Sequence, residues 1–204
     1  MKKTLLFLAS FVLSAFAGED FTHDGFFLNV SAGLGYGSFS DKMDYGYTRN
    51  PELTSEGLQV ETNIKIGGAI INNLILHATL NLNTLFADLE DDAGGSLSHE
   101  GFEIFMLGAG LTYYFPQAGN TFISASAGVS NYSVTFDGKD YDFLNLDNGF
   151  IFNIAIGKEW WIDKSMGLGV AVSFTHSSAT GNYDDVDQDG SSNTFSVVCS
   201  FTIN

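Results

Sequence analysis

Three sets of polar residues in this chain have types and spacings that could support chemistry. The first is the stretch 185–190, Asp-Val-Asp-Gln-Asp-Gly, which matches the first half of a calcium-binding loop. Carboxylates at alternate positions offer oxygen ligands to a hard cation, and the glycine permits the sharp turn that such a loop needs. A complete EF-hand loop needs a bidentate Glu where this chain has Ser196, so a full EF-hand is excluded. The pattern therefore predicts a Ca²⁺ site formed by Asp185, Asp187 and Asp189 alone.

The second set comprises four ionisable residues that could form a charge network: Glu61, Lys65, His77 and Glu159. The third set is His176 and Ser178, whose spacing would place a base close to a hydroxyl nucleophile. What either set can do depends on the elements that carry these side chains and on the face to which each side chain points.

The elements that carry these side chains are predicted to be β-strands, because apolar residues recur at every second position along them. From Met166 to Phe174, large apolar side chains alternate with Gly, Ala and Ser. A strand places these two kinds of side chain on opposite faces. The second face is too small and polar to be the core of a soluble sheet. We therefore expect the large face to lie against lipid, as in a transmembrane β-barrel.

Eight segments repeat this pattern, and we predict a β-strand in each. The connections after the second, fourth and sixth segments are short, whereas those after the first, third, fifth and seventh are long. Such alternation is typical of outer-membrane barrels, which have an even number of strands, short periplasmic turns and long outside loops. The predicted strands are Phe26–Tyr36, Leu58–Ile70, Leu74–Phe86, Phe102–Tyr114, Thr121–Phe136, Phe150–Trp161, Met166–Ser177 and Thr194–Ile203.

The predicted fold class is all-β, an eight-stranded antiparallel up-and-down transmembrane β-barrel. The alternative is a soluble eight-stranded barrel of the lipocalin type, which needs a bulky apolar interior. Aromatic residues at two of the short turns are expected to form the periplasmic girdle; they are Tyr113, Tyr114, Phe115, Trp160 and Trp161. The interior is predicted to be small and polar instead, with Asn29, Ser31, Gly33, Gly35, Gln59, Glu61, Asn63 and Lys65.

The four ionisable residues of the second set are assigned to this narrow interior. Lys65 and Glu159 each lie a few residues before a short turn, so we expect them at similar depth near the periplasmic end. A lone charge in a constricted lumen is costly. We therefore expect Lys65 to pair with Glu159, and Glu61 and His77 to extend the network. The network is predicted to be a polar plug, and the alternative is a gate or a proton path.

Residues 1–17 are predicted to be a cleaved signal peptide, which leaves residues 18–204 as one outer-membrane β-barrel domain. Lys2 and Lys3 precede an apolar run, and Ala15-Phe16-Ala17 is an A-x-A cleavage site. Removal of this segment takes the formal charge from −16 to −18, which argues against nucleic acid as a partner. Cys199 is the single cysteine, so an intrachain disulfide is excluded, and we expect its side chain to face lipid.

The signal peptide, eight strands, short turns and long polar loops together resemble the small outer-membrane β-barrel proteins around the OmpA membrane domain, OmpX and OmpW. The stretches 107–114 and 157–161 carry the resemblance best. It implies a place in the bacterial outer membrane, with outer-membrane lipids and lipopolysaccharide as partners. Barrels of this kind usually end in an aromatic residue, whereas this chain ends Phe201-Thr202-Ile203-Asn204. The assembly signal is therefore either shifted to Phe201 or different.

The four long loops hold 17 of the 24 acidic residues, which predicts a solvated acidic surface outside the cell. We expect a structural or surface-interaction role, with an extracellular protein or surface ligand as partner, no enzymatic activity and no cofactor besides Ca²⁺ in the fourth loop. One alternative is a narrow pore for small or apolar solutes. Another is a lipid A-modifying hydrolase, because His176 and Ser178 resemble a pair in lipid A deacylases. Ala179 stands where that family usually has Asn.

Overall fold

The computed structural model describes residues 22–44, 46, 51–91, 95–97, 101–136, 139–141, 146, 148–183 and 186–204. The predicted signal peptide lies outside these residues and stays a prediction. Nearly all of the described chain is β-strand, interrupted by a short 3-10 turn, η1 (Pro116–Ala118). The described residues include no helix that is long and apolar enough to cross a membrane.

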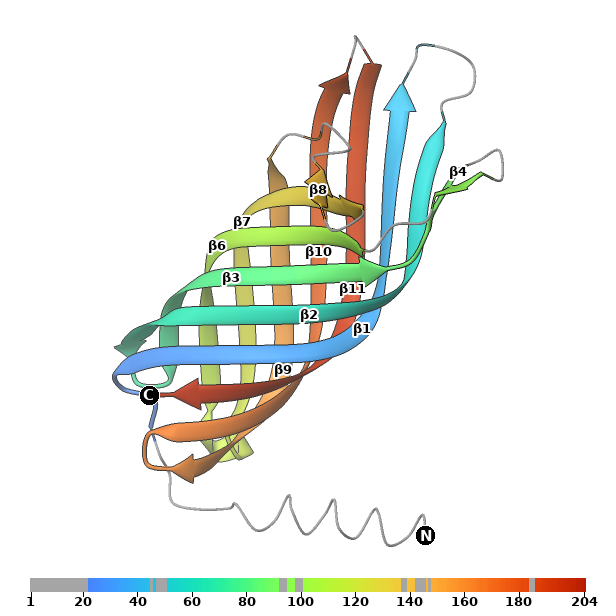
Figure 1. Cartoon of the computed structure of the whole chain (residues 1–204). Coiled ribbons are helices and arrows are strands. Elements are labelled where there is room, and N and C mark those ends of the chain that lie inside the picture. The colour runs from blue at the N-terminus through green and yellow to red at the C-terminus, as the bar shows by residue number, and fades with distance from the viewer. Residues whose placement is uncertain are drawn as a thin grey trace, which may run out of the picture.

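Eight long antiparallel strands close into an up-and-down barrel (Figure 1), which confirms the predicted fold. The first long strand, β1, pairs with both β2 and β11, and this double pairing closes the sheet. Three short strands, β4 (Leu89–Asp91), β5 (Ser96–Leu97) and β8 (Lys139–Tyr141), lie in the connections. The long strands are β1 (Phe26–Asp44), β2 (Glu52–Ile71), β3 (Leu74–Phe86), β6 (Gly101–Phe115), β7 (Thr121–Phe136), β9 (Gly149–Asp163), β10 (Met166–Tyr183) and β11 (Val186–Ile203).

The two faces of the barrel wall have opposite chemistry, as the alternation predicts. Leu34 on the outer face is 71 % exposed, whereas Asn63 on the inner face of the next strand is 2 % exposed. Cys199 also lies on the outer face, exposed as expected. A closed barrel leaves its apolar outer belt no protein to pack against, so this belt is the surface that contacts lipid.

The apolar belt ends abruptly on the side away from the short turns. On β1, Tyr36 is followed on the same face by Ser38, and on β11 Phe195 is followed by Asn193. Aromatic rings line this edge, and the ring centroids of Phe174 and Phe195 are 4.6 Å apart. Such an aromatic girdle marks the boundary between hydrocarbon and the polar headgroup region.

Four strands continue well beyond this girdle, as Figure 1 shows for β1, β2, β10 and β11. The predicted ends of these strands are therefore wrong. Apolar alternation marks only the part of a strand that crosses lipid, whereas backbone pairing continues through polar residues. We call residues 37–44, 52–57, 176–183 and 186–194 the outer wall. It carries many of the acidic residues that were assigned to loops one and four: Asp41, Asp44, Glu52, Glu56, Asp187 and Asp189.

The short turns close the opposite end of the barrel. Asn73 adopts the left-handed conformation, with φ of 67°, in the tight turn between β2 and β3. The predicted aromatic girdle forms here only in part. Tyr113 and Phe115 face outward, but Tyr114 between them points into the lumen and is buried.

Candidate functional site

An apolar cluster fills the outer end of the lumen. The rings of Phe39 and Phe102 lie 4.2 Å apart, and Tyr132 lies 6.0 Å from each. The prediction of a small polar interior is therefore wrong at this end. We call this cluster the apolar cap; its buried members are Phe39, Leu85, Leu89, Phe102, Ile104, Met106, Tyr132, Ile151 and Ala179.

Below the apolar cap, Glu61 is the centre of a buried polar network. One of its oxygens, Oε1, accepts hydrogen bonds from Asn81 Nδ2 at 3.1 Å and from Ser173 Oγ at 3.0 Å. Asn153 in turn donates to Ser173 at 2.7 Å. The other carboxylate oxygen, Oε2, has no hydrogen-bond partner within the described residues. Glu61, Asn63 and Lys65 line a cavity of about 20 Å³, which has room for about one water molecule.

Lys65 and His77 belong to a second branch of lumen contacts. Lys65 Nζ donates to Ser124 Oγ at 2.7 Å. The Ser124 hydroxyl also accepts from Thr112 at 2.8 Å, and Thr112 contacts His77 Nε2 at 3.0 Å. His77 fits because Gly110 faces it, where an added Cβ would lie 2.7 Å from the imidazole. All four predicted network residues are thus buried in the lumen.

The predicted pair between Lys65 and Glu159 is wrong. Lys65 has the contact just described, and Glu159 accepts from Thr202 at 2.5 Å and from Tyr114 at 3.2 Å through Oε2. Lys65 lies seven residues before Asn72, whereas Glu159 lies four before Asp163. At about 3.3 Å per residue the two side chains are offset by roughly 10 Å along their strands.

Glu159 contacts a residue that the sequence did not point to, His23. Glu159 Oε1 lies 3.5 Å from His23 Nε2, and His23 is completely buried. The imidazole stacks on Tyr114 with a centroid distance of 3.6 Å, and Trp161 lies 4.6 Å away. Burial lowers the pKa of His23 from 6.5 to about 4. No apolar alternation includes His23, so no pattern could have identified it.

The segment 22–25 around His23, which we call the N-terminal strap, ties the short-turn end together. The His23 carbonyl accepts from the Asn73 N–H at 2.8 Å, and the Gly25 carbonyl accepts from the Ala69 N–H at 2.9 Å. His23 Nδ1 also lies 2.6 Å from Asn204 Oδ1. The strap thereby links strand β2, the turn that follows it and Asn204 across the end of the lumen.

The described residues of the two other predicted sites lie on the outer wall. Asp187 and Asp189 both lie on strand β11 and point outward, and Asp185 lies outside the described residues. The described residues contain no group of three or more His, Cys, Asp or Glu side chains that could hold a metal, so the calcium site stays a prediction. His176 Nδ1 contacts Asn193 Oδ1 at 2.9 Å rather than a carboxylate.

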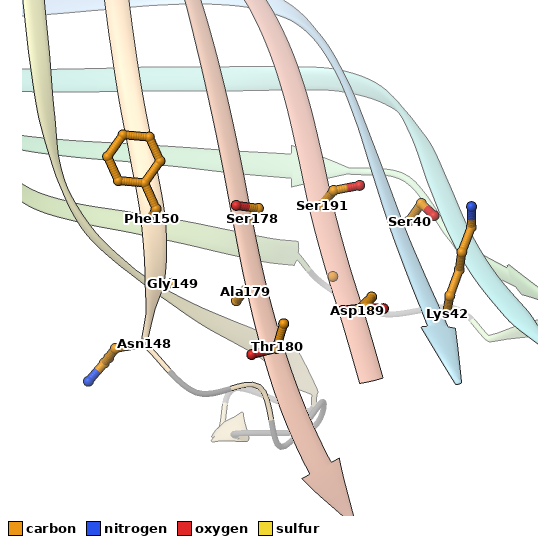
Figure 2. A pocket seen from close by; sticks show the side chains of 11 residues that line it. Ser40, Lys42, Asn148, Gly149, Phe150, Ser178, Ala179, Thr180, Asp189 and Ser191 are labelled. Carbon is orange, nitrogen blue, oxygen red and sulfur yellow. The ribbon is translucent and has the colours of Figure 1, made fainter. Parts of the chain in front are cut away.

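A polar pocket of about 570 Å³ lies on the outside of the outer wall (Figure 2). Strand pairing places Ser40, Ser191, Ser178 and Phe150 in one row across β1, β11, β10 and β9. Lys42, Asp189 and Thr180 form the next row, further from the membrane. A neighbouring hollow of about 440 Å³ shares Thr180 and Asp189 and continues toward the tip of the β10–β11 hairpin.

A closed eight-stranded barrel with a lipid-facing apolar belt and a filled lumen defines a small β-barrel protein of the outer membrane. Comparison with solved structures agrees on this fold. The crystal structure of Neisserial surface protein A aligns with this chain at a TM-score of 0.50 and 12 % sequence identity. The alignment covers 86 % of this chain and 96 % of that protein. The outer membrane protein OprG from Pseudomonas aeruginosa also has a TM-score of 0.50 and 12 % identity, over 89 % of this chain and 98 % of that one. No family model and no curated protein sequence matches the chain.

Proposed function

We propose that this protein is a non-conducting outer-membrane barrel whose role is surface interaction through its outer wall. The observation that carries this proposal is the filled lumen. The apolar cap blocks the outer end, the Glu61 network fills the middle, and the N-terminal strap covers the short-turn end. An eight-stranded barrel is just narrow enough for side chains to fill it in this way.

The outer wall supplies the surface for the interaction. Asp44, Glu56, Asp187 and Asp189 are exposed on paired strands, which hold them in fixed positions. A rigid acidic surface attracts cations and basic protein surfaces and raises their rate of encounter. The partner that this surface fits is therefore a basic protein or peptide outside the cell.

Two measurements test this role. Purified barrel in planar bilayers should leave the conductance at the level of the bare bilayer. A lysine-rich peptide should bind the barrel in nanodiscs, with an affinity that falls as salt rises. Binding should weaken in a Glu56→Gln, Asp187→Asn, Asp189→Asn variant and not in Glu103→Gln, which changes an outward carboxylate on the far strand β6. Steady ion conductance, or equal binding by both variants, would reject the role.

The apolar cap favours a second candidate, a pore for small apolar solutes. Its aromatic and aliphatic side chains offer such a solute an environment at the outer end of the lumen. Onward passage would require displacement of the buried network around Glu61, which is hydrogen-bonded on several strands. Uptake of an apolar dye into liposomes that contain the barrel would support this candidate over the first.

A further inference from the structure

We infer that the pocket on the outer wall binds the sugar headgroup of a glycolipid from the surrounding outer leaflet. The inference adds a second partner to the proposed surface-interaction role and rests on it. Three features carry it: the height of the pocket above the membrane, the charge around it, and the arrangement of its hydroxyl groups.

The pocket lies immediately above the aromatic girdle. Phe150 belongs to both, since it lines the pocket and its ring lies 6.3 Å from that of Phe152 in the girdle. The pocket is also on the outer face of the wall, where the belt below contacts acyl chains. A molecule in this pocket is therefore at the level of the lipid headgroups, and its acyl chains can continue down the apolar belt.

The charge around the pocket selects against a phosphate. Lys42 is the cation in its lining, and strand pairing sets it between Asp189 on β11 and Glu52 on β2. Lys42 Nζ lies 3.9 Å from Glu52 Oε1. Phosphate sites need a surplus of Arg or Lys or of free backbone N–H groups. The charged side chains of this lining are one Lys, Lys42, and one Asp, Asp189, which leave no positive surplus.

The hydroxyl groups suit a neutral sugar. Ser40, Ser191 and Ser178 stand on three adjacent strands, and the exposed ring of Phe150 ends the row, as Figure 2 shows. With strands about 4.8 Å apart the row is roughly 14 Å long, enough for a short oligosaccharide. The Ser40 hydroxyl donates to Glu52 Oε1 at 2.6 Å and keeps its oxygen as an acceptor. Hydroxyl groups beside an apolar ring match the edges and the faces of sugar rings, and the volume lies in the range of ligand pockets.

The experiment titrates the detergent-solubilised barrel with two probes, a rough lipopolysaccharide whose core includes neutral sugars and a deep-rough lipopolysaccharide whose core ends at its acidic inner sugars. Binding should be tighter for the first probe. A Ser178→Ala, Thr180→Ala, Ser191→Ala variant should raise the Kd for that probe about tenfold or more, because two or three hydrogen bonds are lost. An Asn131→Ala, Ser133→Ala variant should bind like the unchanged barrel, since these outward residues lie above the belt on β7, away from the pocket.

Equal affinity for the two probes, or an unchanged Kd in the triple variant, overturns the inference. If the barrel binds the free core oligosaccharide but not the glycolipid, the inference that the ligand comes from the surrounding membrane is overturned. If the triple variant does not fold, an NMR cross-saturation experiment on the unchanged barrel replaces it. Saturation of the sugar protons should attenuate the amide signals of Ser178, Thr180 and Ser191. Attenuation of amide signals only at other residues rejects the site. Conductance in planar bilayers would reject the proposed role without changing this titration, so the two failures are distinguishable.

Discussion

Glu159 and His23 together determine how the short-turn end of the lumen is closed. His23 Nε2 and Glu159 Oε1, 3.5 Å apart, form a favourable contact only when one of these two atoms carries a proton that points at the other. We expect a double-mutant cycle of His23→Ala and Glu159→Gln in urea to give a coupling free energy of about 1 kcal/mol. The cycle of Lys65→Met and Glu159→Gln should give a coupling near zero. A larger coupling for the second pair than for the first would contradict the contacts described for Glu159.

The buried imidazole also predicts how stability depends on pH. The pKa of His23 is lowered to about 4 in the folded state because the ring is desolvated. Above pH 6.5 neither the folded nor the unfolded state carries the extra proton. As the pH falls from 6.5 toward 4, the unfolded state binds a proton that the folded state does not. The contribution of His23 to the unfolding free energy should therefore decrease, by up to about 3 kcal/mol.

The control for this pH effect is His23→Gln, which has no titrating ring. Its unfolding free energy, measured by urea titration at several pH values, should decline less steeply between pH 6.5 and 4 than that of the unchanged protein. Parallel curves for the two proteins would show that His23 does not contribute to the pH dependence.

At the scale of elements, the sequence predicts the part of each strand that crosses lipid and misses the rest. Leu168, Val170 and Val172 alternate with small residues because one face contacts acyl chains, so the strand and its orientation are readable. Beyond Phe174 no such contrast constrains the outer face. Pairing continues there to Tyr183 through backbone hydrogen bonds, which leave no signature in side-chain types.

For the charged residues of the lumen, the sequence likewise predicted which way the side chains face but not which residues they contact. The alternation of inward and outward residues along each strand correctly placed four ionisable side chains in the lumen, those of Glu61, Lys65, His77 and Glu159. The depth of each side chain follows from strand length and register, which the sequence does not specify, so the partners of Lys65 and Glu159 were assigned wrongly. The apolar cap was missed because Phe102, Ile104 and Met106 alternate with outward residues that are partly apolar and partly charged, Phe105 and Leu107 beside Glu103. Neither face of this run is recognisable as the inner one from side-chain types.

The assignment of faces leads to a prediction for single strands. Val170→Arg or Leu80→Arg would place a charge in lipid and should reduce folding stability in bilayers by about 2–4 kcal/mol if the site is near the midplane. Ser173→Thr on the inner face keeps the hydroxyl that contacts Glu61 and Asn153 and should have a small effect. Urea titration in liposomes measures both. Equal tolerance of the two kinds of change would mean that the faces are reversed.

At the scale of the whole molecule, three layers of different chemistry close one lumen. The apolar cap excludes water at the outer end, the middle layer is polar and hydrogen-bonded, and the N-terminal strap covers the far end. The cap and the middle layer each take side chains from several strands, and the strap covers the short-turn end separately. We therefore expect the lumen to stay blocked unless the contacts at both ends are removed. The barrel is thus a rigid support that holds the outer wall at a fixed height above the membrane.

This layered closure predicts how variants behave in planar bilayers. His23→Ala with Tyr114→Ala removes the stacked side chains that fill the short-turn end, while the backbone hydrogen bonds of the strap remain. Phe102→Ser with Met106→Ser makes the outer end polar. Either pair alone should leave the conductance at background, because the opposite end remains blocked. The four changes together should produce ion conductance, since the middle layer that remains is polar and already includes a cavity of about 20 Å³. Gel mobility before and after heating checks that each variant is folded. Conductance in either two-residue variant equal to that of the four-residue variant would show that a single layer closes the lumen.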